Sequence, residues 1–170
     1  MSIKDQTAII TGASGGIAAG VARELSSAGM NLVLTARRAE RLQSLADELG
    51  NCEVVAGDIT DPELPQRLVD GAVARFGGCD VVFNSAGIMH VGSIEEADID
   101  KLCSMVRVNV EAATRMAYVA LKYFKKSSRG HLINVSSVLG TKVRPNAGVY
   151  AGTKYSIEAL SQALRMEVAK

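Results

Sequence analysis

The amino-acid sequence predicts a doubly wound α/β fold, in which helices cover both faces of a parallel β-sheet to give three layers. The main observation is a regular alternation of short apolar runs with longer amphipathic segments, which is typical of successive β–α–β units. A second observation is the group of glycines between the first apolar run and the first amphipathic segment. The chain has 170 residues, of which 48% are hydrophobic, and this length suits one domain spanning residues 1–170.

The apolar runs and the amphipathic segments give the expected order of strands and helices. Strands are expected at Ala8–Thr11, Asn31–Ala36, Cys52–Ala56, Val81–Asn84 and His131–Ser136. Helices are expected at Ile17–Ala28, Ala39–Leu49, Pro62–Phe76, Ile99–Phe124 and Val149–Lys170.

Composition and charge favour a soluble cytoplasmic protein. A net charge of +1 gives no electrostatic argument for binding nucleic acid or an anionic membrane. The start of the chain lacks the apolar region of a signal peptide, and no apolar run is long enough to span a bilayer. Cys52, Cys79 and Cys103 are expected to be buried thiols in a reducing compartment. His90 and His131 lack metal-ligand spacing, so no metal site is expected.

The first predicted strand leads into the glycine-rich stretch Thr11-Gly12-Ala13-Ser14-Gly15-Gly16-Ile17-Ala18. Glycines allow a sharp turn and let phosphate oxygens approach bare N–H groups. The helix that follows adds a partial positive charge at its N-terminus. The position of the loop therefore favours binding of a dinucleotide over a merely flexible turn, although its spacing differs from G-x-G-x-x-G.

Two arginines, Arg37 and Arg38, follow Ala36 at the end of the second predicted strand. An NAD-binding site of this architecture usually carries an acidic residue here, to bind the ribose hydroxyls. A guanidinium instead suits the 2′-phosphate of NADP. The sequence therefore favours NADP(H), the alternative being two arginines on a solvated helix face.

Asp58 follows the third predicted strand, at the edge of the sheet where ligands bind in open α/β folds. It can contact the amino group of an adenine, or it can serve only the local turn. Thr60 or Asp61 is expected to cap the helix that Pro62 begins.

Two asparagines are candidates for the same site. Asn84 ends the fourth predicted strand and can hydrogen-bond both the backbone and a ligand. Asn109 lies inside a long helical pattern, where asparagine is unfavourable because its side chain competes for backbone bonds. A locally bent helix that turns Asn109 toward the site would explain its presence, and a surface asparagine is the alternative.

Tyr150 and Lys154 are four residues apart at the start of the last predicted helix, so their side chains share one face. A cation beside a phenol stabilises the phenolate, and such a pair can exchange a proton with a carbonyl or alcohol oxygen. Ser137 follows the fifth predicted strand and can return beside the start of this helix. Tyr-x-x-x-Lys pairs are also common on solvated helix faces, so this pair gains weight only with the other motifs.

Together these segments resemble the short-chain dehydrogenase/reductase family, of extended Rossmann type, and the resemblance covers nearly the whole chain. Thr11-Gly12-x-x-x-Gly16-Ile17-Ala18 is similar to the family's cofactor loop, and Asn84-Ser85-Ala86-Gly87 to its Asn-Asn-Ala-Gly motif. Each motif is weak alone, but the complete set in register is specific. The resemblance implies a catalytic tetrad of Asn109, Ser137, Tyr150 and Lys154.

The resemblance also implies the strand order 3-2-1-4-5 and a cofactor, NADP(H). It assigns the binding of that cofactor to Gly12, Ser14, Gly15, Gly16, Ile17, Arg37, Arg38, Asp58, Ile59, Asn84, Ala86, Gly87, Tyr150 and Lys154. Family members continue with sixth and seventh strands and a substrate lid, whereas this sequence stops at Lys170. The domain is therefore expected to be C-terminally incomplete relative to the family.

The implied reaction is hydride transfer between NADP(H) and a small carbonyl or secondary alcohol, with Tyr150 as general acid and base. One alternative is a 3-oxoacyl-[acyl-carrier-protein] reductase, and another is a catalytically impaired fragment that binds NADP(H) or dimerises. The family's long helices pair between subunits, so a homo-oligomer is expected through residues 99–124 and 149–170. The side chains expected to supply that surface are Met105, Val108, Ala112, Met116, Val119 and Phe124.

Overall fold

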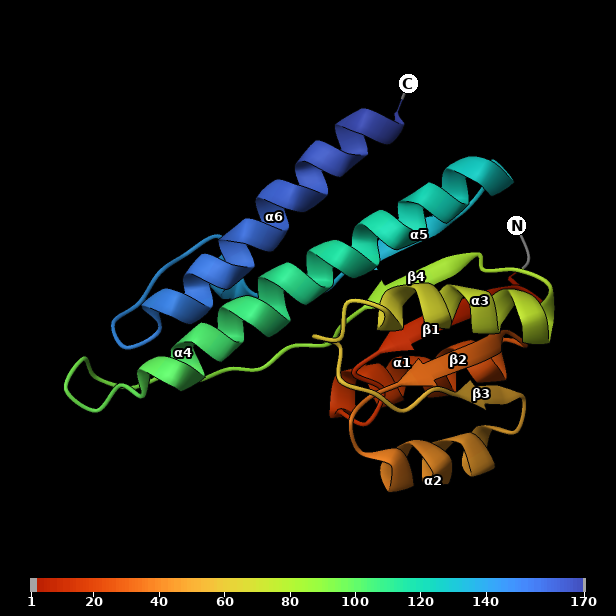
Figure 1. Ribbon diagram of the computed structural model, residues 1–170, viewed down its shortest axis with the longest axis horizontal. Coiled ribbons are helices and arrows are strands. Elements are labelled where there is room, and N and C mark those ends of the chain that lie inside the picture. The colour runs from red at the N-terminus through yellow and green to blue at the C-terminus, as the bar shows by residue number, and fades with distance from the viewer. Residues whose placement is uncertain (1–2, 170) are drawn as a thin grey trace.

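The computed structural model describes residues 3–169, in which five parallel strands form one sheet. The strands are β1 (Thr7–Thr11), β2 (Asn31–Thr35), β3 (Cys52–Val54), β4 (Val81–Asn84) and β5 (His131–Asn134). Their order is β3-β2-β1-β4-β5, as the resemblance implied (Figure 1). Met1, Ser2 and Lys170, which the predicted domain and final helix include, lie outside the described residues.

Helices cover both faces of the sheet, which confirms the predicted doubly wound fold. On one side lie α1 (Gly16–Ser27) and α2 (Ala39–Leu49), and on the other lie α3 (Leu64–Phe76) and α5 (Ala113–Ser127). The predicted helix 99–124 consists of α4 (Ile99–Val106), the π-helical segment η1 (Arg107–Ala112) and α5. A 3₁₀ turn, η2 (Val138–Gly140), precedes the last helix, α6 (Gly148–Val168). The rod of α4, η1 and α5 extends past the sheet beside α6 (Figure 1).

Alternate residues of the central strands supply two separate cores, because successive side chains of a strand point to opposite faces. Ala8, Ile10 and Leu34 pack against α1 and α2. Ile9 and Val33 pack against α3 and α5 instead. Each of these five side chains is fully buried, so the central strands are apolar on both sides, as parallel sheets require.

The predicted start of the third helix is wrong by two residues. Pro62 does not begin α3, which starts at Leu64. Asp61 forms a turn before the helix, because its side chain accepts from Glu63 N at 3.0 Å and its carbonyl accepts from Leu64 N at 3.2 Å. Pro65 lies in the first helical turn, where the missing N–H of proline is tolerated.

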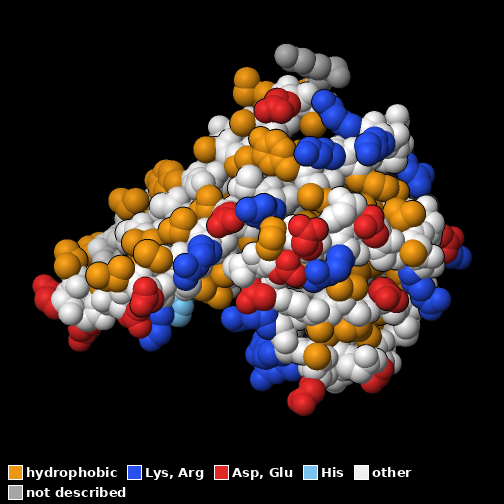
Figure 2. All heavy atoms as spheres, in the orientation of Figure 1, with side chains coloured by type: hydrophobic (Ala, Val, Ile, Leu, Met, Phe, Trp, Pro, Cys, Tyr) orange, Lys and Arg blue, Asp and Glu red, His pale blue; other side chains and the backbone are white. Residues whose placement is uncertain are grey.

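The side chains predicted to form an oligomer surface on the long helix face the core instead. Met105, Ala112 and Met116 are 0% exposed, and Phe124 is 6% exposed. Val108 and Val119 pack against the same core. The large apolar side chains that are exposed on the rod and on α6 are Ile99, Val106, Tyr118, Val149, Tyr155, Met166 and Val168. Figure 2 shows hydrophobic side chains along this part of the surface.

The cysteine prediction is correct for one residue only. Cys79 is buried, Cys52 is half-buried and Cys103 is exposed on α4. Burial raises the pKa of the Cys79 thiol to about 12 and that of Cys52 to about 11. Within residues 3–169, no helix combines the length and the apolar character needed to cross a membrane.

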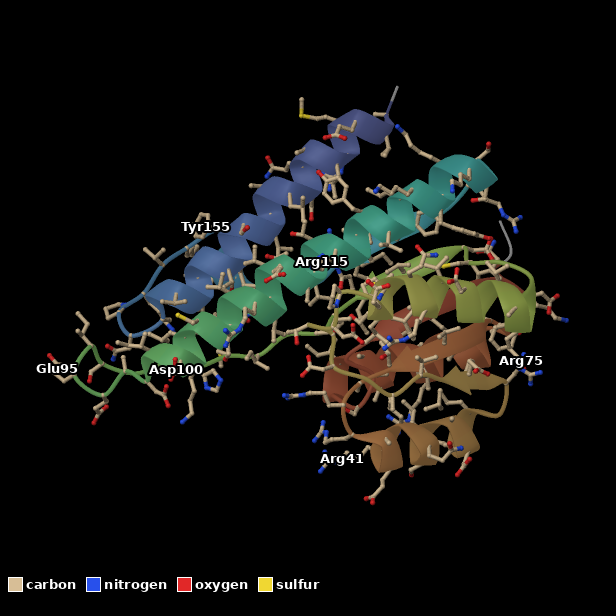
Figure 3. All side chains as sticks on the ribbon, viewed as in Figure 1. Arg41, Arg75, Glu95, Asp100, Arg115 and Tyr155 are labelled. Carbon is tan, nitrogen blue, oxygen red and sulfur yellow. The ribbon has the colours of Figure 1, made fainter. Side chains whose placement is uncertain are left out.

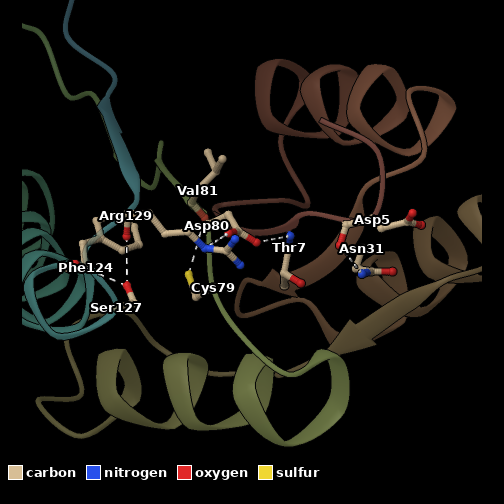
Figure 4. A network of polar contacts seen from close by, with 9 residues as sticks. All are labelled: Asp5, Thr7, Asn31, Cys79, Asp80, Val81, Phe124, Ser127 and Arg129. Carbon is tan, nitrogen blue, oxygen red and sulfur yellow. Dashed lines mark hydrogen bonds and ion pairs between the residues drawn. The ribbon is translucent and has the colours of Figure 1, made fainter. Parts of the chain in front are cut away.

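Asp80 connects three segments at the amino-terminal edge of the sheet (Figure 4). Its carboxylate accepts from Thr7 N at 2.9 Å and pairs with Arg129 Nε at 3.0 Å. Its backbone carbonyl accepts from His131 N at 2.8 Å. These bonds fix the starts of β1, β4 and β5 relative to one another, and leave the carboxyl ends of the strands to form the candidate site.

Candidate active site

The glycine-rich loop lies directly against the segment that follows β4. Gly12 adopts φ +72°, and a Cβ at this position would lie 3.0 Å from Ala86 Cα and 3.2 Å from Ala86 N. Gly15 N donates to Gly12 O at 2.9 Å, which closes the turn. Helix α1 then starts without a side-chain cap or an acidic residue in its first turn. Its N-terminal partial charge is therefore not neutralised within the first turn.

The hydroxyl of Thr11 joins the carboxyl ends of β1 and β4. Thr11 Oγ1 accepts from Ser85 N at 3.0 Å and from Ala86 N at 2.9 Å. Its own proton is donated to Asn84 Oδ1 at 3.4 Å. No pattern along the chain indicated this contact, because Thr11 lies far from Asn84–Ala86 in the sequence. The contact holds one wall of the cavity described next.

A cavity of about 190 Å³ opens where β1, β2 and β4 end. Predicted cofactor-binding residues that line it are Gly12, Ser14, Gly15, Arg37, Arg38, Asp58, Ile59, Ala86 and Gly87. The lining also includes Thr35, Ala36, Gly57, Ile88 and Val108. Figure 2 shows a notch on this side of the molecule, between the projecting helical arm and the rest, with Lys and Arg side chains gathered beside it.

Five predicted cofactor-binding residues do not line this cavity, namely Gly16, Ile17, Asn84, Tyr150 and Lys154. Gly16 and Ile17 lie at the start of α1, and the Ile17 side chain is 68% exposed. Asn84 lies behind the cavity and is 5% exposed. Its amide nitrogen donates to Ala113 O and to Asn134 Oδ1, both at 3.0 Å. The hydrogen bonds of Asn84 therefore hold β4 to α5 and β5.

The two predicted arginines differ in their surroundings. Arg38 donates to Ser14 O at 2.8 Å and to Ser14 Oγ at 3.0 Å, so its guanidinium is already held against the glycine loop. Arg37 is exposed at the same rim.

Asp58 accepts from Thr60 N and Thr60 Oγ1, and these bonds lower the pKa of its carboxyl group. The local turn considered for Asp58 is thus formed.

The residues of the cavity fit a dinucleotide. The loop leaves open space above Gly16, where a Cβ would meet nothing within 4 Å. The buried hydroxyl of Thr35, in the cavity lining, has no hydrogen-bond partner in the part of the chain that the structure describes. A phosphate can approach the loop backbone, and a polar ligand could use this hydroxyl. Among residues 3–169 no cluster of three or more His, Cys, Asp or Glu could hold a metal ion.

Asn109 lies in η1, and its side chain turns inward, as the bent-helix interpretation expected. It is 1% exposed. Its Oδ1 accepts from Ile88 N and its Nδ2 donates to Ile88 O, both at 2.8 Å. A π-helical segment widens the helix locally and is frequent at functional sites. The Asn109 amide thereby holds the wall of the cavity at Ile88.

Tyr150 and Lys154 lie on the same face of α6, as their spacing predicted. The ammonium nitrogen of Lys154 is 5.8 Å from the centre of the Tyr150 ring. Lys154 Nζ donates to Val135 O at 2.9 Å, and the residue is 7% exposed. Burial lowers the pKa of this ammonium group. A Cβ added to Gly87 would lie 3.8 Å from Lys154 Nζ, so the lysine also borders the cavity wall.

Ser137 lies beside the same helix. It caps η2, and its Oγ accepts from Leu139 N at 3.2 Å. Leu139 packs with Ala147 and Ala151 in a small apolar cluster that also contacts Tyr150. This cluster fixes η2 against the first turn of α6, so all four predicted tetrad residues belong to adjoining segments.

Comparison with known proteins agrees with this geometry. A family model described as short chain dehydrogenase matches residues 6–170. The chain belongs to the short chain dehydrogenase family. An uncharacterized oxidoreductase of Staphylococcus saprophyticus is 36% identical over 170 residues, covering 99% of this chain and 69% of the relative.

Solved structures of short chain dehydrogenases share the fold. One from Burkholderia phymatum, in complex with NAD, has a TM-score of 0.94 at 26% identity and covers 99% of this chain and 62% of that chain. A metagenomic short-chain oxidoreductase, in complex with NADP, has a TM-score of 0.91 at 30% identity, with 99% of this chain and 79% of that chain covered. Family and relatives identify the protein as an oxidoreductase of this family.

The Gly12 contact gives a test of the loop. We expect Gly12→Ala to lower the free energy of unfolding by about 1–3 kcal/mol, because the methyl group meets the Ala86 backbone at a φ unfavourable for alanine. Gly16→Ala is the control, since its added Cβ meets nothing within 4 Å and alanine favours helix. Thermal unfolding measures both variants. Equal Tm values for the two would contradict the close approach.

Proposed function

We propose that the protein transfers a hydride between NADP(H) and a carbonyl or secondary alcohol. The observation that carries the proposal is the position of Lys154. Its ammonium group borders the cavity wall at Gly87 and also lies beside the ring of Tyr150. The buried Lys154 ammonium group therefore lies between the Tyr150 ring and the cavity that fits a dinucleotide.

In the reduction direction, each residue has a separate task. A reduced nicotinamide held in the cavity would supply the hydride for the carbonyl carbon and would itself be oxidised, while the protein supplies position and the proton. Tyr150 gives its hydroxyl proton to the carbonyl oxygen, and Ser137 donates a hydrogen bond to that oxygen. The charge of Lys154 stabilises the tyrosinate that remains until a proton from solvent replaces the one transferred. In oxidation the same steps run in reverse.

The first functional prediction concerns the phenol. We expect Tyr150→Phe to lower kcat for NADPH-dependent ketone reduction by about 10²–10⁴-fold, because the general acid is lost. The dissociation constant of NADPH should change by less than about threefold, because the phenyl ring is kept. Turnover is followed by NADPH absorbance, and binding by NADPH fluorescence. Tyr155→Phe is the matched control on the same helix, where the tyrosine is exposed (Figure 3).

The outcome in the unaltered chain separates enzyme from binding module. NADPH consumption with at least one member of a panel of ketones and aldehydes is expected. Binding of NADPH without consumption across that panel would contradict the reductase and favour a cofactor-binding module. Full activity in Tyr150→Phe would contradict the role of the phenol.

We propose that the cofactor is NADP(H) in preference to NAD(H). Arg37 and Arg38 line the rim of the cavity, and Arg38 is already oriented by its bonds to Ser14. No acidic residue follows β2 directly, since Ala36 precedes the two arginines. Relatives with bound NADP and with bound NAD share the fold, so this chain's own residues carry the argument.

The arginines can be tested by their effect on the ratio of the two cofactors. We expect Arg37→Ala with Arg38→Ala to weaken NADPH binding about 10–100-fold, because charge-assisted bonds to a phosphate contribute about 1.5–3 kcal/mol. NADH binding should change by less than about threefold. Fluorescence titration measures both. Arg41→Ala is the control, because Arg41 lies at the start of α2 and does not line the cavity (Figure 3). An equal loss for both cofactors would overturn the assignment.

We propose that the protein forms a homodimer through the exposed side of the rod and α6. Ile99 is 72% exposed and Met166 is 73% exposed, and such apolar side chains favour association. We expect a dimer in sedimentation velocity at micromolar concentration, and a shift to monomer in Ile99→Glu. Val73→Glu, at an exposed position on α3, is the control. A monomeric unaltered chain would contradict the proposal.

A further inference from the structure

Thr153 is buried between Asn109, which holds the cavity wall, and the Tyr150–Lys154 pair. It lies on α6 between Tyr150 and Lys154, and it is 3% exposed. Its hydroxyl donates to Tyr150 O at 2.7 Å. The same oxygen accepts from Asn109 Nδ2 at 3.2 Å. Thr153 is therefore the hydrogen-bonded link between α6 and η1, which lie side by side (Figure 1).

The direction of each bond follows from the atoms available. A backbone carbonyl can only accept, so the single proton of the Thr153 hydroxyl goes to Tyr150 O. The hydroxyl oxygen is then left as an acceptor, which suits only the NH₂ end of the Asn109 amide. Threonine in a helix readily bonds to the carbonyl three residues earlier, so this rotamer is favourable.

Both N–H donors of the Asn109 amide are used in this arrangement, and its oxygen accepts one bond. Its oxygen accepts from Ile88 N, and its NH₂ group donates to Ile88 O and to Thr153 Oγ1. Ile88 lines the cavity that fits the dinucleotide. A continuous hydrogen-bonded path thus runs from the cavity wall through Asn109 and Thr153 to the backbone of Tyr150.

We propose that Thr153 is a positioning residue, which holds the helix carrying Tyr150 and Lys154 in register with the cavity wall at Ile88. The inference rests on the proposed reductase function, in which the proton donor must meet a carbonyl bound next to the cofactor. A loose link would leave cofactor binding intact and lower the fraction of complexes in which Tyr150 is aligned. Even a small misalignment of a proton donor relative to its substrate lowers turnover strongly.

The test compares three variants. Thr153→Val keeps the shape and removes the hydroxyl, and Thr153→Ser restores the hydroxyl. Ser161→Ala is the matched control on α6, because Ser161 Oγ likewise accepts from an asparagine amide, Asn134 Nδ2, at 2.9 Å. If Thr153→Val does not fold, Thr153→Cys replaces it, since a thiol is a weak hydrogen-bond partner.

Two readouts are needed, of which one does not depend on turnover. The first is hydrogen exchange of the Asn109 side-chain amide by NMR, which should be at least about tenfold faster in Thr153→Val than in the unaltered protein, because one buried bond is lost. The second is ketone reduction, in which kcat should fall about tenfold while KM and the NADPH dissociation constant change less than about threefold. Thr153→Ser should recover most of both values, and Ser161→Ala should change neither.

The outcomes are distinguishable from failure of the proposed function. If the unaltered protein reduces no carbonyl, the reductase proposal fails. Separately, unchanged exchange of the Asn109 side-chain amide in Thr153→Val would contradict the proposed hydrogen-bonded link between Asn109 and Thr153. Faster exchange with unchanged kcat would overturn the positioning role in an active enzyme. Equal effects of Thr153→Val and Ser161→Ala on kcat would show that the loss comes from general destabilisation of α6, and would also overturn it.

Discussion

The close approach of the ends of β1 and β4 is the constraint on which the candidate site depends. The sheet reverses its order at this point, because β1 pairs with β2 on one side and with β4 on the other. Connections leave such a point in opposite directions, and a crevice opens between them. Gly12 allows the two backbones to come within contact distance, and Thr11 bonds to two consecutive amides of the facing segment. Without this contact the walls of the cavity would have no fixed separation.

The segment Ala86–Ile88 is held from two directions, so the proposed cofactor site and the proposed reacting groups share one wall. Thr11 binds it on the side of the glycine loop, and Asn109 binds it on the side of α6. Its backbone N–H groups are therefore largely satisfied by side chains outside the sheet ladder. Buried polar groups that are bonded in this way give a single, well-defined arrangement. A displacement of either support would move the cavity and the reacting groups together.

The sequence pattern was sufficient for the layers, and the family resemblance added the strand order. Neither was sufficient for contacts between distant segments. Short apolar runs and helical periodicity predict elements because they follow from local geometry, and nearly all of the predicted ranges match within two residues. Which side of a long helix is buried was predicted wrongly for Met105, Ala112 and Met116. Periodicity identifies an apolar stripe but not what covers it, and here Ala112 and Met116 pack in the core that also contains strand residues Ile9 and Val33. The Ser14–Arg38 and Asn109–Thr153 bonds depend on tertiary packing, so no pattern along the chain could reveal them.

Lys154 shows why these contacts matter for chemistry. Among residues 3–169 it makes no ion pair, and its ammonium group has the carbonyl of Val135 as its hydrogen-bond partner. Burial lowers its pKa, so the charged form is less favourable in the folded than in the unfolded chain. The resulting cost to stability is present at pH values below the lowered pKa and is lost as the pH rises through the ordinary value for lysine. A carboxylate placed beside Lys154 would remove this cost and would also neutralise the charge. Without such a carboxylate, the positive charge remains beside the Tyr150 ring and the cavity wall, where the proposed proton transfer would develop a negative charge.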